Sequence, residues 1–507
     1  MATVAGAKAR RLSQGPLALT LAGAGIAGVA LRVWVYRGDL GIPNSDEGVV
    51  GLMARHLVYD GQFPVFFWGQ AYGGPQEAIL AVPGVLLFGG SWLALRLVPL
   101  ALFVATLWLV WRVGVRILGE PRASLAAALY WVWPPFVFYV ITHEMGFYGT
   151  DVFYCALLLL LALRVVEKPD NRLGAGLFGL VAGLAFWQTS QIVPIIVAVA
   201  IWAVWRSPRC LRVAWVAVLA AVLGALPWIV WNATHSWASF DLPSGASSTY
   251  THRLRVFFSP VLPMMLGIRT PVSQQPLLLP SAAVNLVYLV LLGLFLWGAW
   301  HTRRRPVSLL YVAAAVYPFV YGLAAQTFDS SDPRYLVVMT PVLVLLVAQV
   351  LTSWWRGALA IAVACVISVL TIHRMEPLPT KALASGSLPT APRDLSPLVS
   401  TLDRLHLDRV YAPYLLAYVL DFHTQERIIA VEAKFDRVRF EGDRAVLPNH
   451  PSTRHPSWLS EVENAPRHGI VIFKADETST PIVPVLLKRG WRRVAVGPFV
   501  VLAPPRP

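Results

Sequence analysis

Two adjacent carboxylates, Asp46 and Glu47, stand about ten residues beyond the first long apolar stretch of the chain, residues 16–36. An ionised carboxylate is costly in hydrocarbon, so this pair belongs at a membrane surface or in a cavity. There a carboxylate can act as a general base, because burial raises its pKa toward the pH at which the protein works. Taken alone, the pair fits a solvated loop equally well.

Further charged side chains occur in later polar segments between apolar stretches. His143, Glu144 and Asp151 lie in a short polar break, and Arg334-Tyr335 directly precedes a late apolar stretch. An arginine can hold a phosphate through two hydrogen bonds. Carboxylates and an arginine together suit attack by an acceptor hydroxyl or amine on a sugar carbon whose leaving group is a lipid phosphate. The same residue types could form the proton relay of a transporter.

The composition requires lipid as a solvent for most of the chain. Of its 507 residues, 56% are apolar and 14% are charged, with a mean hydropathy of +0.59, whereas soluble domains carry about 25% charged residues. The net charge of +15 comes from short basic runs between apolar stretches, which indicates topology signals rather than a nucleic-acid surface. The three cysteines lie in or beside apolar segments and predict neither a disulfide framework nor a metal site.

The apolar pattern predicts about eleven transmembrane helices. They are placed at roughly 16–36, 93–115, 123–142, 149–166, 173–188, 190–205, 211–231, 280–300, 307–325, 335–353 and 357–373. With a cytoplasmic N-terminus, every compact basic cluster, such as residues 303–305, falls on the cytoplasmic side. This holds only if residues 77–89 do not cross the membrane, and that run is too short to do so.

The first outer loop, about residues 37–92, then carries the acidic pair outside. Within it, residues 47–59 have apolar side chains at helical spacing, and two interpretations stand: a helix on the membrane surface, or a helix packed on the bundle. Residues 374–395 are predicted to be a linker, and residues 396–507 a small soluble α/β domain, with strands near 409–412, 427–431, 470–473, 493–496 and 499–502. An odd number of spans places this domain outside the cytoplasm.

These features together resemble the GT-C class of membrane glycosyltransferases. The chain is most similar to the family-39-like branch that contains protein O-mannosyltransferases, lipid A aminoarabinose transferases and bacterial Rgt-type transferases. The resemblance rests on residues 45–48 (SDEG), 69–75 (GQAYGGP), Arg96-Leu97, 116–119 (RILG) and 332–336 (DPRYL), in that order, and it covers about residues 10–372. It implies a GT-C-like transmembrane domain over residues 1–373.

The resemblance implies an inverting transfer from a polyprenyl-phosphate-linked sugar to an envelope acceptor, outside the cytoplasmic membrane. Asp46 would be the general base and Glu47 its partner, with Asp151 or Glu144 as a second acid. The substrate-binding candidates are Arg334 on the donor phosphate, with Tyr335, Arg96, Tyr72 and His143 as further contacts. Structural roles compete for several of these: snorkelling from a helix end for Arg96, an interface histidine for His143, and an ion pair with Asp329 or Asp332 for Arg334.

One departure concerns the segment before Gln76, which reads Gly73-Gly74-Pro75 where aminoarabinose transferases have a lysine, so another residue must meet the phosphate or the donor differs. Many members of the class work without metal and some distant ones bind a divalent cation through such acids; we expect no cofactor here. The expected partners are the lipid-linked donor, an envelope acceptor of protein, glycan or lipid, and membrane lipids, but no nucleic acid. The alternatives are a transporter or lipid flippase, and a non-catalytic partner in envelope assembly.

Overall fold

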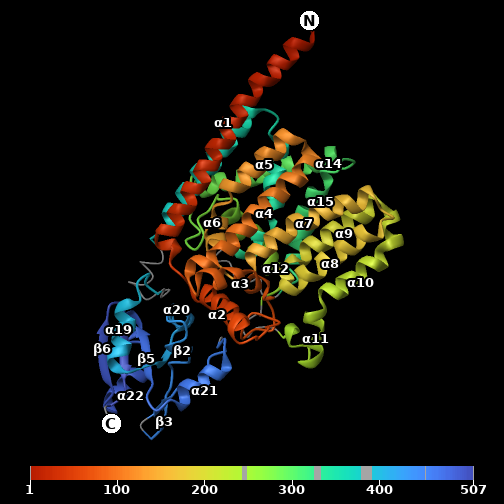
Figure 1. Ribbon diagram of the computed structural model, residues 1–507. Coiled ribbons are helices and arrows are strands. Elements are labelled where there is room, and N and C mark those ends of the chain that lie inside the picture. The colour runs from red at the N-terminus through yellow and green to blue at the C-terminus, as the bar shows by residue number, and fades with distance from the viewer. Residues whose placement is uncertain are drawn as a thin grey trace. The chain divides into compact units, whose positions relative to one another are not determined.

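The computed structural model describes residues 2–241, 248–324, 333–377, 391–442, 444–451 and 453–505 (Figure 1). The chain divides into two compact units. The helical unit comprises Met1–Val35, Pro99–Thr142 and Phe147–Met375, and the mixed unit comprises Tyr36–Val98, His143–Gly146 and Glu376–Pro507. Each unit is therefore assembled from segments that are distant in the sequence.

Long apolar helices build the helical unit. Its elements are most of α1 (Ala2–Arg37) and α4 (Trp92–Leu118), then α5 (Glu120–Val132), α6 (Pro135–Thr142), α7 (Tyr148–Glu167), α8 (Arg172–Gln188), η2 (Ser190–Ile192), α9 (Val193–Arg206), η3 (Pro208–Val213), α10 (Ala214–Gly224), α11 (Leu226–Thr234), η4 (Ala238–Phe240), α12 (Tyr250–Val256), η5 (Phe257–Val261), α13 (Leu262–Met265), α14 (Ser281–Thr302), α15 (Ser308–Tyr321), η7 (Arg334–Met339), α16 (Thr340–Val350) and α17 (Trp354–Met375). Helices α8 and α10 lie side by side (Figure 1). They approach so closely that a Cβ on Gly179 would lie 1.9 Å from the Ala217 carbonyl oxygen.

The helices agree with a multi-pass membrane protein, but the predicted number of eleven spans is not confirmed. Among the described residues, five helices are long and apolar enough to cross a membrane, or seven if each of two bent pairs counts as one span. Every predicted range contains helix, yet several helices are short: α15 has 14 residues and α16 has 11. A helix needs about 20 residues to cross the hydrocarbon core. The run predicted to be too short forms α3 (Gln76–Phe88), a helix of 13 residues.

The mixed unit combines the first loop with a sheet. Its elements are η1 (Asp39–Gly41), α2 (Ser45–Tyr59), α3, α19 (Ser396–Leu405), β1 (Arg409–Ala412), α20 (Tyr414–His423), β2 (Ile429–Glu432), β3 (Arg439–Glu441), β4 (Arg444–Val446), α21 (Pro456–Asn464), β5 (Gly469–Phe473), η8 (Lys474–Asp476), α22 (Ile482–Lys488), β6 (Arg492–Val496) and β7 (Phe499–Ala503). The five-stranded sheet has the order β2-β1-β5-β7-β6, in which β1 is parallel to β2 and β5 whereas β7 is antiparallel to β5 and β6. The five predicted strands coincide with β1, β2, β5, β6 and β7 to within two residues, whereas the β3–β4 hairpin and α21 were not predicted.

Helix α20 is buried on two sides. It connects the parallel strands β1 and β2 and packs on both, and it also packs on α2. Two glycines of α2 make this second contact close: a Cβ on Gly48 would lie 2.3 Å from the Tyr418 carbonyl oxygen, and one on Gly51 would lie 2.4 Å from the Phe422 ring. The predicted helix at 47–59 therefore exists, and a helix of the C-terminal region covers one of its faces. The predicted linker, residues 374–395, lies partly outside the described residues, so the predicted domain boundaries stay a prediction.

Candidate active site

The acidic pair begins a helix rather than lying in a loop. Asn44 caps α2, and its side-chain oxygen accepts a hydrogen bond from the Glu47 backbone N–H at 3.0 Å. Asp46 and Glu47 occupy the first turn, where the positive end of the helix dipole stabilises negative charge. Their side chains have different environments: the Glu47 side chain is 0% exposed and that of Asp46 is 37% exposed.

Glu47 forms a buried ion pair with Arg96. Arg96 Nε donates to Glu47 Oε1 at 2.6 Å, and a terminal nitrogen donates to Oε2 at 3.0 Å and to the Gly41 carbonyl oxygen at 3.0 Å. The guanidinium also lies over the Tyr36 ring. A bidentate pair of this kind fixes both side chains. Arg96, a predicted substrate-binding residue, is thus held by Glu47 at the N-terminal end of α2.

Asp46 contacts two residues of the C-terminal region. The Tyr414 hydroxyl donates a short hydrogen bond to Asp46 Oδ1. Arg454 donates to the same hydroxyl from Nε at 3.2 Å and from a terminal nitrogen at 2.9 Å, and this terminal nitrogen lies 3.9 Å from Asp46 Oδ1. Burial and the charge of Asp46 raise the pKa of Tyr414 well above its ordinary value, so the phenol keeps the proton that it donates.

Aromatic and polar groups of the first loop surround Arg454. Its guanidinium lies 5.1 Å from the Phe67 ring centroid and 5.0 Å from that of Tyr414. With its amide oxygen turned toward Arg454, Gln70 accepts from one terminal nitrogen at 3.1 Å and from the other at 2.5 Å. Tyr72 is close enough to interact with the charges of Arg454 and Asp46, and burial is the main cause of its raised pKa. The predicted site residue Tyr72 therefore belongs to the surroundings of Asp46.

The short segment 143–146 contributes two buried groups to the mixed unit. A ring nitrogen of His143 lies 3.1 Å from the Ile42 carbonyl oxygen, and Glu144 Oε1 accepts from the Gly146 N–H at 3.1 Å. Glu144 also interacts with the buried Glu77 carboxyl. Burial and this second carboxyl raise the pKa of Glu144 well above its ordinary value, which favours its protonated form.

Three predicted site residues belong to the helical unit. Asp151 is buried in the first turn of α7, and Arg334 and Tyr335 begin η7, which packs on α7. The Tyr335 carbonyl oxygen accepts a hydrogen bond from the Tyr317 hydroxyl at 2.7 Å. Asp329 and Asp332, the predicted partners of Arg334, lie outside the described residues. The proximity of Arg334 to Asp46 stays a prediction.

A second polar cluster joins α2 to the C-terminal region. One ring nitrogen of His56 lies 2.9 Å from Glu426 Oε2, and the other lies 3.0 Å from Asp60 Oδ2. Burial alone would lower the pKa of His56, but the hydrogen bond and charge of Glu426, with contributions from Asp60 and Gln62, together raise that pKa. Trp68, His455 and Trp458 pack their rings around His56. This cluster stabilises the contact between the two segments.

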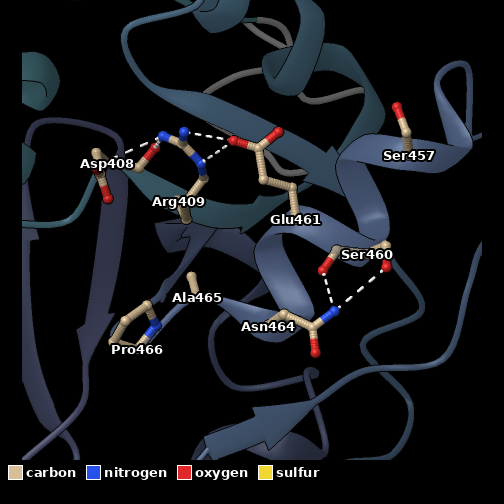
Figure 2. Close-up of a pocket in the computed structure, with 8 residues that line it drawn as sticks. All are labelled: Asp408, Arg409, Ser457, Ser460, Glu461, Asn464, Ala465 and Pro466. Carbon is tan, nitrogen blue, oxygen red and sulfur yellow. Dashed lines mark hydrogen bonds and ion pairs between the residues drawn. The ribbon is translucent and has the colours of Figure 1, made fainter.

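An open pocket of ≈ 670 Å³ lies elsewhere in the mixed unit, between β1 and α21 (Figure 2). Its charged and polar side chains bond mainly to one another: Arg409 donates to Glu461 at 2.7 Å, and the Asn464 amide donates to the Ser460 carbonyl oxygen at 2.8 Å (Figure 2). The pocket contains none of the residues around Asp46. Among the described residues, no group of three His, Cys, Asp or Glu side chains is arranged to hold a metal ion, and the expectation of no cofactor stays a prediction.

Sequence reasoning missed Tyr414 and Arg454. Tyr414 lies 368 positions beyond Asp46, and no motif or spacing in the chain connects the two. The lack of a lysine before Gln76 indicated only that another residue must meet the phosphate or that the donor differs, and it pointed to neither Tyr414 nor Arg454. Two of the predicted residues, Glu47 and Arg96, do come together, and so do Asp46 and Tyr72.

The comparisons with known proteins agree with this fold. Residues 76–231 match the family model described as dolichyl-phosphate-mannose-protein mannosyltransferase. The crystal structure of ArnT from Cupriavidus metallidurans in the apo state shares 14% sequence identity, with a TM-score of 0.61 over 97% of this chain and 98% of that one. The same protein bound to undecaprenyl phosphate shares 16% identity, with a TM-score of 0.60 over the same fractions.

No curated protein sequence matches the chain. The likeness to ArnT is a likeness of fold, and it extends over nearly the whole of both chains. The match to the family model covers the segment from α3 into α11. The shared fold extends over nearly the whole chain whereas the family match covers residues 76–231, so together the comparisons show an ArnT-like fold.

Proposed function

We propose that this protein is an inverting glycosyltransferase that moves a sugar from a polyprenyl-phosphate-linked donor to an envelope acceptor, on the outer side of the cytoplasmic membrane. The observation that carries the proposal is the environment of Asp46. Its carboxylate is partly exposed and is held in the first turn of α2 by a phenol hydroxyl. A fixed carboxylate that solvent can reach is suited to take a proton from an acceptor.

The proposed reaction is a single displacement. Asp46 takes the proton of the acceptor hydroxyl or amine as the acceptor atom bonds to the anomeric carbon. The bond from that carbon to the phosphate oxygen breaks, and polyprenyl phosphate leaves with the electron pair. Attack opposite the leaving group inverts the anomeric centre. The binding of undecaprenyl phosphate by the ArnT structure supports a donor of this chemical class.

The other roles divide between the units. Arg334 is proposed to contact the donor phosphate, and Asp151 or Glu144 to act as the second acid. Glu47 and Arg96 are proposed to position Asp46 by anchoring the first turn of α2, since their charges neutralise one another. The helices of the helical unit would hold the isoprenoid chain. The proposal names no particular acceptor, because the shape of the pocket, and not these residues, decides acceptor specificity.

The experiment compares glycan products of purified protein in liposomes that carry a defined polyprenyl-phosphate sugar and a pool of envelope acceptors, with mass spectrometry as the readout. Asp46→Asn is expected to lower kcat by roughly 10²- to 10⁴-fold, the usual contribution of a general base. Arg493→Gln, at an exposed ion pair with Glu477, is the control and should leave kcat unchanged. Glu144→Gln and Asp151→Asn identify the second acid.

Three results would overturn all or part of the proposal. Full activity of Asp46→Asn removes Asp46 as the base. Movement of the lipid-linked sugar across sealed vesicles without a new glycosidic bond would instead indicate a transporter or flippase. If deletion of residues 374–507 disrupts envelope assembly while Asp46→Asn has no effect, the protein is a non-catalytic partner.

A further inference from the structure

We infer that the C-terminal region is part of the catalytic centre, because Tyr414 and Arg454 are positioning residues for Asp46. This inference rests on the proposed function and adds to it. It assigns these two residues the task of holding the base with one carboxylate oxygen engaged, so that the second oxygen is left for the acceptor.

The hydrogen bonds among the three side chains can run in only one direction. A guanidinium donates and never accepts, so Arg454 must donate to the Tyr414 oxygen. The single O–H of Tyr414 then points to Asp46 Oδ1. Arg454 thereby fixes the orientation of the phenol, and the phenol fixes the rotamer of Asp46.

The contrast with Glu47 shows why this arrangement suits a reactive group. Glu47 is paired directly with Arg96 through two hydrogen bonds and is fully buried, which neutralises it. Asp46, one residue earlier, instead accepts a hydrogen bond from the neutral Tyr414 phenol. The charged Arg454 nitrogen is 3.9 Å from its Oδ1, and the Asp46 side chain is 37% exposed. A purely structural ion pair has no need of an interposed hydroxyl or of solvent access.

The backbone holds Tyr414 in register with the start of α2. The Ser45 hydroxyl donates to the Tyr414 carbonyl oxygen, and Gly48 brings α2 against the next turn of α20 at Tyr418. The Tyr418 hydroxyl in turn accepts from the Arg454 backbone N–H at 2.6 Å. Both positioning residues are thus anchored to the first two turns of α20, which pack on the turn of α2 that carries Asp46.

The test is steady-state kinetics of Tyr414→Phe in the liposome assay, with Tyr59→Phe, at an exposed tyrosine of α2, as the matched control. We expect kcat to fall about 10- to 100-fold, the range for loss of a hydrogen bond to a charged group, with KM for the donor within about twofold. The control should change neither.

Two further comparisons separate positioning from folding. Arg454→Lys keeps a cation that can donate to Tyr414, and it should retain more activity than Arg454→Gln. Tyr414→Phe added to Asp46→Asn should cause no further loss, because the phenol acts only through Asp46. If Tyr414→Phe leaves kcat unchanged, or if its effect is undiminished in the Asp46→Asn background, the inference is wrong while the proposed function stands. Absence of transfer by the wild-type protein would remove both.

Discussion

The buried ion pair between Glu47 and Arg96 gives the most specific prediction about stability. Arg96→Met keeps much of the side-chain volume but removes the guanidinium that neutralises Glu47. The Glu47 side chain is 0% exposed, so its carboxylate would be left in a site that water does not reach. Removal of one partner of a buried ion pair costs about 3–5 kcal/mol, because the remaining charge is uncompensated.

The geometry places this pair toward the upper part of that range. Both carboxylate oxygens accept from Arg96, at 2.6 and 3.0 Å, and the same guanidinium also binds the Gly41 carbonyl oxygen, which would lose its donor. For a unit of about 150–250 residues, 1 kcal/mol corresponds to roughly 2–4 °C in the unfolding midpoint. At about 4–5 kcal/mol, we therefore expect the midpoint of Arg96→Met to fall by roughly 8–20 °C.

The assay is thermal unfolding in one detergent at a fixed scan rate, since the unfolding of large membrane proteins is commonly irreversible. Arg116→Met is the matched control on the same helix: its pair with Glu167, at 3.1 Å, joins side chains that are 26% and 53% exposed, and such pairs contribute about 0–1 kcal/mol. Arg96→Met combined with Glu47→Leu should recover most of the loss, because an apolar pair of similar size replaces the charges. Equal midpoints for Arg96→Met and Arg116→Met would refute the reasoning.

Two further predictions concern the contact between α2 and the C-terminal region. Gly48→Ala places a methyl group 2.3 Å from the Tyr418 backbone, so α20 must shift. We expect the free energy of unfolding to fall by about 1–3 kcal/mol, measured by thermal unfolding, and kcat to drop. Wild-type values for both quantities would contradict the close packing. Burial and the charge of His56 lower the pKa of His455 from 6.5 to about 4, so the unfolded chain binds more protons between these values and wild-type stability falls as the pH drops from 6.5 toward 4. His455→Phe keeps a ring beside Trp68 and Trp458 but cannot titrate. Its unfolding midpoint should therefore decline less steeply than that of the wild type as the pH falls from 6.5 to 4, and the two should have the same pH dependence above pH 7. Parallel curves of midpoint against pH throughout would count against the assignment.

Much of the local structure follows from the sequence because it depends on nearby residues. Alternating and periodic apolar side chains located the helices and the five main strands, and Asn44-Ser45-Asp46-Glu47 carries the signals of a helix start. The number of spans could not be derived in the same way. The 65° bend between α5 and α6, for example, falls inside the single predicted span 123–142, and the periodicity of the apolar residues does not record it.

The surroundings of Asp46 were predictable only from its own loop. Tyr72 and Arg96, the ion-pair partner of Glu47, lie in or near the motifs of the first loop, so the sequence predicted both as site residues. Tyr414 and Arg454 did not, because a lone tyrosine after a proline and a lone arginine before a histidine carry no local signal of a site. Their role depends on a tertiary contact that α2 permits only through Gly48 and Gly51.

The order in which the ribosome makes these helices adds a further consequence. Asp46 emerges 368 positions before Tyr414, a delay on the order of tens of seconds at ~5–20 residues per second. Throughout that interval the face of α2 that carries Gly48 and Gly51 lacks α20, the helix that will cover it. The intervening apolar helices are still being inserted during this time. A chain that ended before α20 would therefore leave Asp46 without its Tyr414 partner and this face of α2 without the helix that covers it.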